Sequence, residues 1–103
     1  MANYELTEAA DEDLKGIALC TISKWGPGQA ARYGAFLDAH FEAIGSGRAR
    51  TRAFLRHRSE FRVSRARHHY VFHLEREKLC PLILAVLHEH MDLMTRLRAR
   101  LGD

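Results

Sequence analysis

The first half of the chain has apolar residues spaced three or four apart, as on one side of a helix. The first such stripe predicts a helix over residues 8–24, with Thr7 as its N-cap. It consists of Ala10, Leu14, Ile17, Ala18, Thr21 and Trp25.

A second stripe follows the helix-breaking run Gly26-Pro27-Gly28. It consists of Ala30, Tyr33, Leu37, Phe41 and Ile44, and Gly45-Ser46-Gly47 ends it. Two helices of similar length joined by a tight turn predict an antiparallel helical hairpin.

Strand-like patterns flank this hairpin. Residues 3–6 form a short alternating run, and so do residues 61–65 and 69–74. Residues 79–87 are nearly all apolar, as in a central strand that is buried on both faces. Residues 65–68 and 75–78 are predicted hairpin turns, and residues 48–60 a loop with an irregular strand or turn near Phe54 and Leu55.

The pattern ends in an amphipathic helix over residues 91–101. Met94, Leu97 and Leu101 are predicted to point inward, and Arg96 and Arg100 outward. Because this apolar stripe is narrow, the helix suits either the core or a partner interface. The element order is then β-α-α-β-β-β-α. This order predicts an α+β fold, a helix hairpin packed on a small, mainly antiparallel sheet, with residues 1–103 as a single domain.

Composition narrows the class of protein. Hydrophobic residues make up 47% of the chain and charged residues 28%, which is typical of a soluble globular domain. No apolar run reaches the roughly 18 residues of a membrane span, and no secretory signal opens the chain, so a cytoplasmic protein is expected. Cys20 and Cys80 lack metal or redox spacing and are expected to be reduced core residues.

Charge is distributed unevenly along the chain. Residues 1–47 carry a net charge of −4, residues 48–67 carry +7, and residues 68–103 are balanced. The middle stretch holds eight arginines and one acid, Glu60. It indicates an anionic partner, either nucleic acid or an acidic protein segment, or else a basic solvated loop.

Arginine and histidine at the predicted strand ends are candidate catalytic residues. Arg65, Arg67, His68 and His88 could together supply the cations and the acid or base that RNA cleavage needs. No aromatic residue follows Phe72 to stack on a base, which argues against cleavage, although Phe54 or Phe61 could substitute. His88 is otherwise interpreted as a strand-end residue that hydrogen-bonds to backbone.

Histidines also raise the question of a metal site. The candidates are His68, His69, His73, His88 and His90. Their spacing matches no known zinc motif, since His88-Glu89-His90 is too short for a His-Glu-x-x-His helix. The sequence therefore predicts neither a metal nor a cofactor.

Four segments, taken together, resemble ParE-type toxins of the RelE/ParE toxin superfamily. The first is Tyr4-Glu5-Leu6-Thr7-Glu8-Ala9-Ala10 with Asp13, Leu14 and Ile17, and the second is Trp25-Gly26 with Gln29, Ala30 and Tyr33. The others are Arg67-His68-His69-Tyr70-Val71-Phe72 and Val86-Leu87-His88-Glu89-His90-Met91-Asp92. They occur in the family's order over nearly the whole chain.

The resemblance implies the toxin of a bacterial type II toxin–antitoxin module of the plasmid-stabilisation kind. Such a toxin is expected to inhibit DNA gyrase by binding and to be neutralised by a ParD-like antitoxin in a hetero-oligomer. The alternative is a RelE-like mRNA interferase, with RNA as a partner only in that case. A third reading is a non-toxic remnant that binds antitoxin.

Candidate binding residues for the antitoxin or the target are Arg56, Arg58, Arg65, Arg67, Met94, Leu97 and Arg96. An acidic antitoxin tail should be attracted to the arginine-rich stretch, and at least Arg56 or Arg58 is expected to meet its carboxylates.

Overall fold

The computed structural model describes residues 3–101, so residues 1, 2, 102 and 103 of the predicted domain lie outside the described residues. The predicted order of elements is confirmed, with one short strand added inside the arginine-rich stretch. The elements are β1 (Glu5–Leu6), α1 (Glu8–Trp25), α2 (Pro27–Gly45), β2 (Arg52–Ala53), β3 (Phe61–Ala66), β4 (His69–Arg76), β5 (Leu79–His88) and α3 (Leu93–Leu101).

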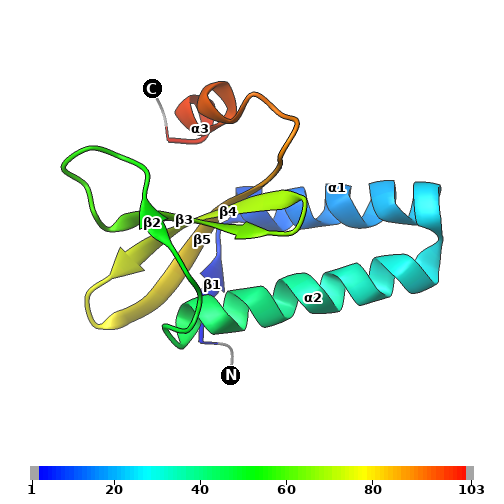
Figure 1. The fold of residues 1–103 in the computed structure, drawn as a ribbon, viewed down its shortest axis with the longest axis horizontal. Helices are drawn as coiled ribbons and strands as arrows, with labels where there is room; N and C mark the ends of the chain where they lie inside the picture. Colours follow the sequence, from blue (N-terminus) through cyan, green and yellow to red (C-terminus); the bar gives the residue numbers. More distant parts are fainter. Residues whose placement is uncertain (1–2, 102–103) are drawn as a thin grey trace.

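The strands form one sheet in the order β1-β5-β4-β3-β2 (Figure 1). Strand β1 is parallel to β5, and the three other pairs are antiparallel. The predicted α+β fold with a mainly antiparallel sheet is therefore confirmed. Strand β5 lies inside the sheet and residues 83–87 are buried, as its continuous apolar sequence predicts.

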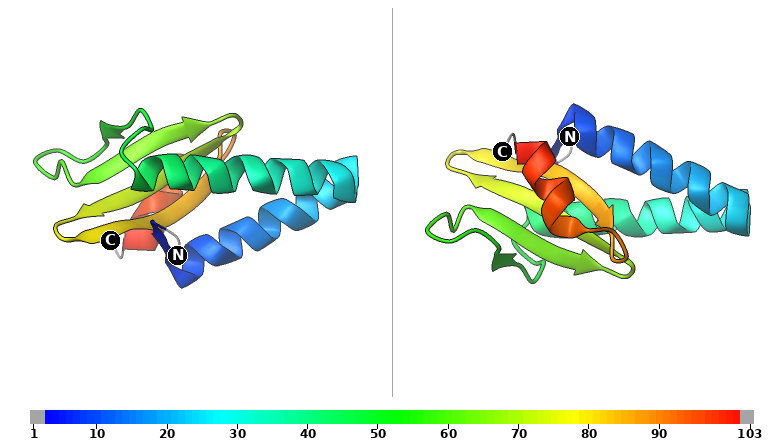
Figure 2. Two further views of the ribbon diagram at one scale, coloured as in Figure 1. Left: turned by 90° about the horizontal axis from the view of Figure 1, so that it is seen from below. Right: turned by 90° about the horizontal axis from the view of Figure 1, so that it is seen from above.

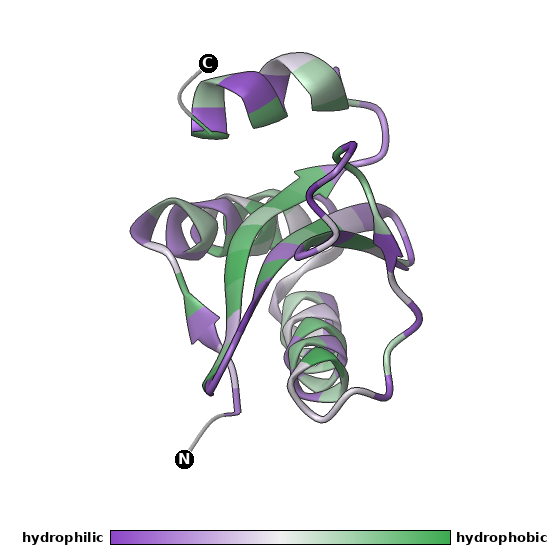
Figure 3. Cartoon of the chain, turned by 90° about the vertical axis from the view of Figure 1, so that its left-hand side faces the viewer, coloured by the Kyte–Doolittle hydropathy of each residue, from purple (hydrophilic) through white to green (hydrophobic). Residues whose placement is uncertain are grey.

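Helices cover both faces of the sheet, the hairpin of α1 and α2 on one side and α3 on the other (Figure 3). Alternation along the strands supplies each face with its own core. The hairpin-side core contains Ala10, Leu37, Phe41, Ile44, Ala66, Val71, Ile83 and Val86. The α3-side core contains Val63, Phe72, Ala85, Leu87 and Leu97.

The helix hairpin is longer than the sheet that supports it. The Thr7 hydroxyl accepts the N–H of Ala10 at 3.0 Å and begins α1. Gly26, with φ of 88°, makes the turn into α2, a conformation that suits glycine. The tip of the hairpin extends past the end of the sheet (Figures 1 and 2). Ala18 and Trp25, at this end of the apolar stripe of α1, are therefore exposed, Trp25 to 72%.

Helix α3 is attached differently from the sequence expectation. Leu97 is buried as predicted, but Met94 is 58% exposed. Arg100, predicted to point outward, is half-buried and binds Asp13 of α1 with both terminal nitrogens, at 3.0 and 3.1 Å. It also donates to the Leu84 carbonyl at 2.8 Å. Charge from α1 thus holds the far end of α3.

The prediction that both cysteines are core residues is wrong. Cys20 lies on the overhanging part of α1 and is exposed, and Cys80 near the start of β5 is half-buried. Both are free thiols, as expected. No helix of the described residues is long and apolar enough to cross a bilayer.

Candidate functional site

The turn between β3 and β4 and the end of β5 lie side by side, because His69 pairs in register with both Ala66 and His88. This pairing gathers side chains that we call the strand-end cluster: Arg65, His68, His69, Tyr70, His88 and Glu89.

Glu89 is the centre of this cluster. Its two carboxylate oxygens accept hydrogen bonds from Arg65 Nη2 and from His68 Nδ1, the latter at 2.9 Å. The bond from His68, with the nearby charge of Arg65, holds the pKa of Glu89 below its usual range. Glu89 is therefore a carboxylate that binds two of the predicted site residues, Arg65 and His68.

Arg65 has further partners within the fold. Its Nε donates to the Arg67 carbonyl at 2.9 Å, and its Nη1 donates to the Tyr70 hydroxyl at 3.0 Å. The guanidinium also lies 5.3 Å from the centre of the Tyr70 ring. Arg65 is thus held in one position on the α3 face of the sheet, together with an aromatic ring.

His69 occupies the opposite side of the cluster, under the helix hairpin. It is buried, and its Nδ1 lies 2.5 Å from the Tyr33 hydroxyl of α2. Burial, and then the nearby His88 and His68, lower the pKa of His69 to about 4, against an opposing effect of Glu89. His69 is therefore neutral near physiological pH.

His88 has the structural role that sequence reasoning offered for it. Its Nδ1 accepts the backbone N–H of His90 at 3.1 Å, which confirms the interpretation as a strand-end residue bonded to backbone. Its ring packs edge-on against His69 with centroids 5.1 Å apart.

Arg67 does not join the other predicted site residues. Its guanidinium lies 4.2 Å from the centre of the Phe36 ring on α2. The structure thus brings Arg65, His68 and His88 to one cluster and directs Arg67 to the helix hairpin.

Sequence reasoning missed three members of the site or its support: Glu89, Tyr70 and Tyr33. Glu89 was visible in the His-Glu-His segment, but only the pairing of β5 with β4 shows what it binds. Tyr70, which precedes Phe72, is an aromatic ring in the cluster on which a base could stack. Phe54, one of the two substitutes considered from the sequence, is half-buried and packs on Phe61 and Phe72.

A groove of about 1100 Å³ opens between the overhanging helix hairpin and the strand-end cluster; we call it the hairpin groove. Ile17, Cys20 and Thr21 of α1 line one side, and Tyr33 of α2 lines another. Trp25, His88 and Met91 also contribute. Its lining combines apolar side chains with charged ones of both signs, Glu12, Asp13, Lys24 and Arg32, and suits an amphipathic partner segment.

The remaining predicted binding residues lie outside this groove. Arg56 and Arg58 are exposed in the loop between β2 and β3, where Arg58 pairs with Glu60 at 3.0 Å. Arg96 and Met94 are exposed on α3, whereas Leu97 is buried beneath it. Within residues 3–101, no three His, Cys, Asp or Glu side chains are placed to hold a metal ion.

Residues 4–93 match a family model described as the ParE toxin of the type II toxin–antitoxin system parDE. The chain belongs to the ParE toxin family. It is 41% identical over 101 residues to Toxin ParE of Escherichia coli, and the match covers 98% of each chain. The fold is also similar to a solved structure from the chromosomal ParDE system of P. aeruginosa, with a TM-score of 0.69. That match covers 85% of this chain and 96% of the other, at 14% identity.

Proposed function

We propose that this ParE-type toxin inhibits DNA gyrase by binding it, and that a ParD-like antitoxin neutralises it. The observation that carries the proposal is the state of the strand-end cluster. Arg65 and His68 both bind the Glu89 carboxylate. The cluster therefore presents compensated charge to its surroundings.

Compensated charge is a poor starting point for RNA cleavage. A phosphorane transition state needs free cations aimed at the developing negative charge. An ionised Glu89 within hydrogen-bond distance of Arg65 and His68 would repel the scissile phosphate and compete with it for both side chains. His88 Nδ1 already accepts a backbone N–H, which leaves Nε2 as its free ring nitrogen. These contacts favour a binding surface over a catalytic site.

Purified toxin tests the proposal directly. With supercoiled plasmid and DNA gyrase, it should inhibit supercoiling and increase the fraction of cleaved DNA, and antitoxin should reverse both effects. A transcript incubated with the same preparation should remain intact. Cleaved transcript together with unaffected gyrase would overturn the proposal.

One observation keeps an mRNA interferase as the second candidate. Tyr70 holds its ring and hydroxyl beside Arg65, at the place where a splayed base could stack. In that case, His88→Ala should abolish transcript cleavage because the substitution removes the proposed base. Full toxicity in the His88→Ala variant, with gyrase inhibition retained, removes this alternative.

The hairpin groove is the proposed seat of the antitoxin. It combines Ile17, Trp25 and Met91 with the basic Lys24 and Arg32. An amphipathic helix presents an apolar stripe flanked by charge, and grooves of this shape accept such helices. Arg56 and Arg58, exposed in the loop between β2 and β3, then provide a second, electrostatic attachment for an acidic tail.

A further inference from the structure

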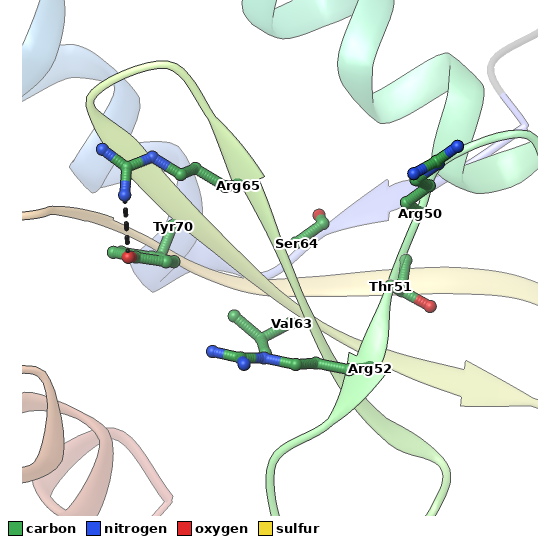
Figure 4. A pocket seen from close by; sticks show the side chains of 7 residues that line it. All are labelled: Arg50, Thr51, Arg52, Val63, Ser64, Arg65 and Tyr70. Carbon is green, nitrogen blue, oxygen red and sulfur yellow. Dashed lines mark hydrogen bonds between the residues drawn. The ribbon is translucent and has the colours of Figure 1, made fainter.

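A second pocket lies on the opposite face of the sheet from the helix hairpin, between β2 and the β3–β4 pair. Its volume is about 330 Å³, and it is lined by Arg50, Thr51, Arg52, Val63, Ser64, Arg65 and Tyr70 (Figure 4). We call it the arginine pocket. None of its lining residues is acidic.

The three arginines of the pocket are not equally available. Arg65 is held by Glu89 and Tyr70 and forms a fixed wall. Arg50 and Arg52 are exposed, and within residues 3–101 neither side chain forms a hydrogen bond or an ion pair. In Figure 4, the Arg52 side chain extends along Val63 toward the middle of the pocket, whereas Arg50 stands at the rim. Two uncompensated guanidinium groups therefore stand at this pocket.

Other arginines of the stretch are already used by the fold. Arg62 donates from Nε to the Thr51 hydroxyl at 3.0 Å and from Nη2 to the Thr51 carbonyl at 2.9 Å. This clamp fixes the backbone beside Arg50 and Arg52, so the pocket is built by neighbouring contacts. Arg96 and Arg98 of α3 are exposed and belong to the helix that packs on this same face.

The surroundings distinguish a nucleic acid from a protein partner. Protein interfaces usually place apolar or aromatic anchors at their centre. Across residues 3–101, the large exposed apolar side chains are Leu19, Ile22, Trp25, Leu79, Met91 and Met94. None of them belongs to residues 48–70, where Phe54 packs inward on Phe61 and Phe72. A strongly basic surface without an apolar anchor is characteristic of phosphate-backbone binding.

We propose that the arginine pocket binds the phosphodiester backbone of nucleic acid. Guanidinium groups match phosphate oxygens with paired hydrogen bonds, and the fixed Arg65 and Tyr70 provide a wall against which a sugar or base can rest. The binding is independent of base sequence. The pocket shares Arg65 and Tyr70 with the strand-end cluster but does not include His68 or His88, so backbone binding there requires no cleavage chemistry.

Fluorescence anisotropy with three labelled probes tests this inference on the full chain. The probes are a 20-base-pair DNA duplex, a 20-nucleotide single-stranded RNA and a 20-residue polyglutamate peptide. The double variant Arg50→Glu/Arg52→Glu should bind the duplex about tenfold more weakly at low salt. Its plot of log K against log salt should be shallower by about two, because each of the two arginines neutralises about one phosphate.

The matched control is Lys24→Glu/Arg32→Glu, which makes the same change in net charge on the helix hairpin. It should bind the duplex much as the wild type does, apart from a small general effect of net charge. If charge reversal unfolds the protein, the neutral double variant Arg50→Gln/Arg52→Gln replaces it, provided that its melting temperature is unchanged.

Comparing the affinities for the DNA duplex and for the single-stranded RNA then shows which nucleic acid the pocket binds more tightly.

Three results would overturn the inference. One is equal loss of duplex binding in the pocket variant and in the hairpin control. Another is duplex binding that does not weaken with salt. The third is polyglutamate that displaces the duplex and binds more tightly, which would reassign the pocket to an acidic protein segment. Because no gyrase is present, the outcome does not depend on whether gyrase is the toxin's target.

Discussion

Individual histidines in this protein differ because their surroundings differ. His69 and His73 are buried, whereas His68 and His90 are exposed. Burial is the main cause that lowers the pKa of His69 and also of His73, where Glu75 opposes it. His69, whose pKa is lowered to about 4, lies against Tyr33 of α2 and His88 of β5.

Stability should therefore fall as the pH drops below 6.5. Between pH 6.5 and about 4, the unfolded His69 binds a proton and the folded one does not, so protonation favours unfolding. From pH 7.5 to pH 5, His69 alone should cost about 2 kcal/mol of unfolding free energy. Urea unfolding of the wild type and of His69→Phe at both pH values measures this loss.

His69→Phe cannot form a hydrogen bond with the Tyr33 hydroxyl at any pH. The quantity to compare is therefore the change in unfolding free energy with pH, not its absolute value. His90→Gln is the control, because His90 is exposed and should leave the slope unchanged. An equal slope in the wild type and in His69→Phe would contradict the assignment to His69.

At the scale of elements, α3 is joined to the rest of the molecule mainly by Leu97 and by one ion pair. Asp13 of α1 accepts two bonds from Arg100 and also the N–H of Val86 in β5, at 3.0 Å. One carboxylate thus links α1, β5 and α3. It also satisfies a backbone group that β1 does not reach, since β1 pairs only with Leu82 and Ile83.

Asp13→Ala should destabilise the fold by about 2–3 kcal/mol, because it leaves a half-buried Arg100 without its carboxylate and the Val86 N–H without its side-chain partner. The control is Asp11→Ala, whose carboxylate pairs with Lys15 at an exposed site and should matter by less than about 0.5 kcal/mol. Thermal unfolding of both variants provides the measurement. Similar melting temperatures for the two would show that Asp13 does not hold α3.

At the scale of the whole molecule, charge and apolar surface lie in different places. The exposed Leu19, Ile22 and Trp25 are on the overhanging hairpin, and the uncompensated arginines are at the β2 edge. The two proposed partners can therefore occupy separate surfaces, an amphipathic antitoxin segment on the hairpin and nucleic acid at the β2 edge.

Trp25, the single tryptophan of the chain, lies in the hairpin groove and should report that the partner is seated there. In the free toxin its fluorescence should be quenched readily by iodide, since the ring is 72% exposed. Adding a tryptophan-free antitoxin should shift the emission to shorter wavelength and reduce quenching severalfold. Unchanged quenching in a saturated complex would place the antitoxin elsewhere.

The arginine-rich loop should govern how fast the antitoxin binds. Arg56→Glu should slow association about threefold or more at low salt, because steering by opposite charge acts on the encounter rate. Lys78→Glu makes the same charge change in the β4–β5 turn and should have a smaller effect. Stopped-flow mixing at two salt concentrations measures the association rates of the two variants. Equal rates for both variants would exclude steering by Arg56.

The elements that local patterns define were predictable from sequence. The stripes of α1 and α2 and the apolar run of β5 depend on neighbours within a few residues, and all three elements were placed correctly. The irregular strand or turn predicted near Phe54 and Leu55 is strand β2, which begins two residues earlier, at Arg52, and nothing in Arg52 and Ala53 indicates their pairing with Val63 and Arg62.

The site was only partly predictable, because several of its contacts depend on strand pairing and not on neighbours in the sequence. Arg65, His68 and His88 could be proposed from residue type, since histidines and arginines are rare enough to attract attention. Glu89 as their common partner depends on strand register, and the partner of Arg100 is Asp13, 87 residues away in sequence. Met94 was misplaced because the short α3 offers the sheet little more than Leu97.

The two edge strands have a consequence for how the free protein behaves in concentrated solution. Strands β1 and β2 have two residues each, and fibril-forming segments generally need six or seven. Beside β1, Glu5 is held by Arg76, and arginines flank β2. The sheet therefore ends in borders too short and too charged to seed stacking. We expect a solution of free toxin to stay clear and thioflavin-negative on prolonged storage.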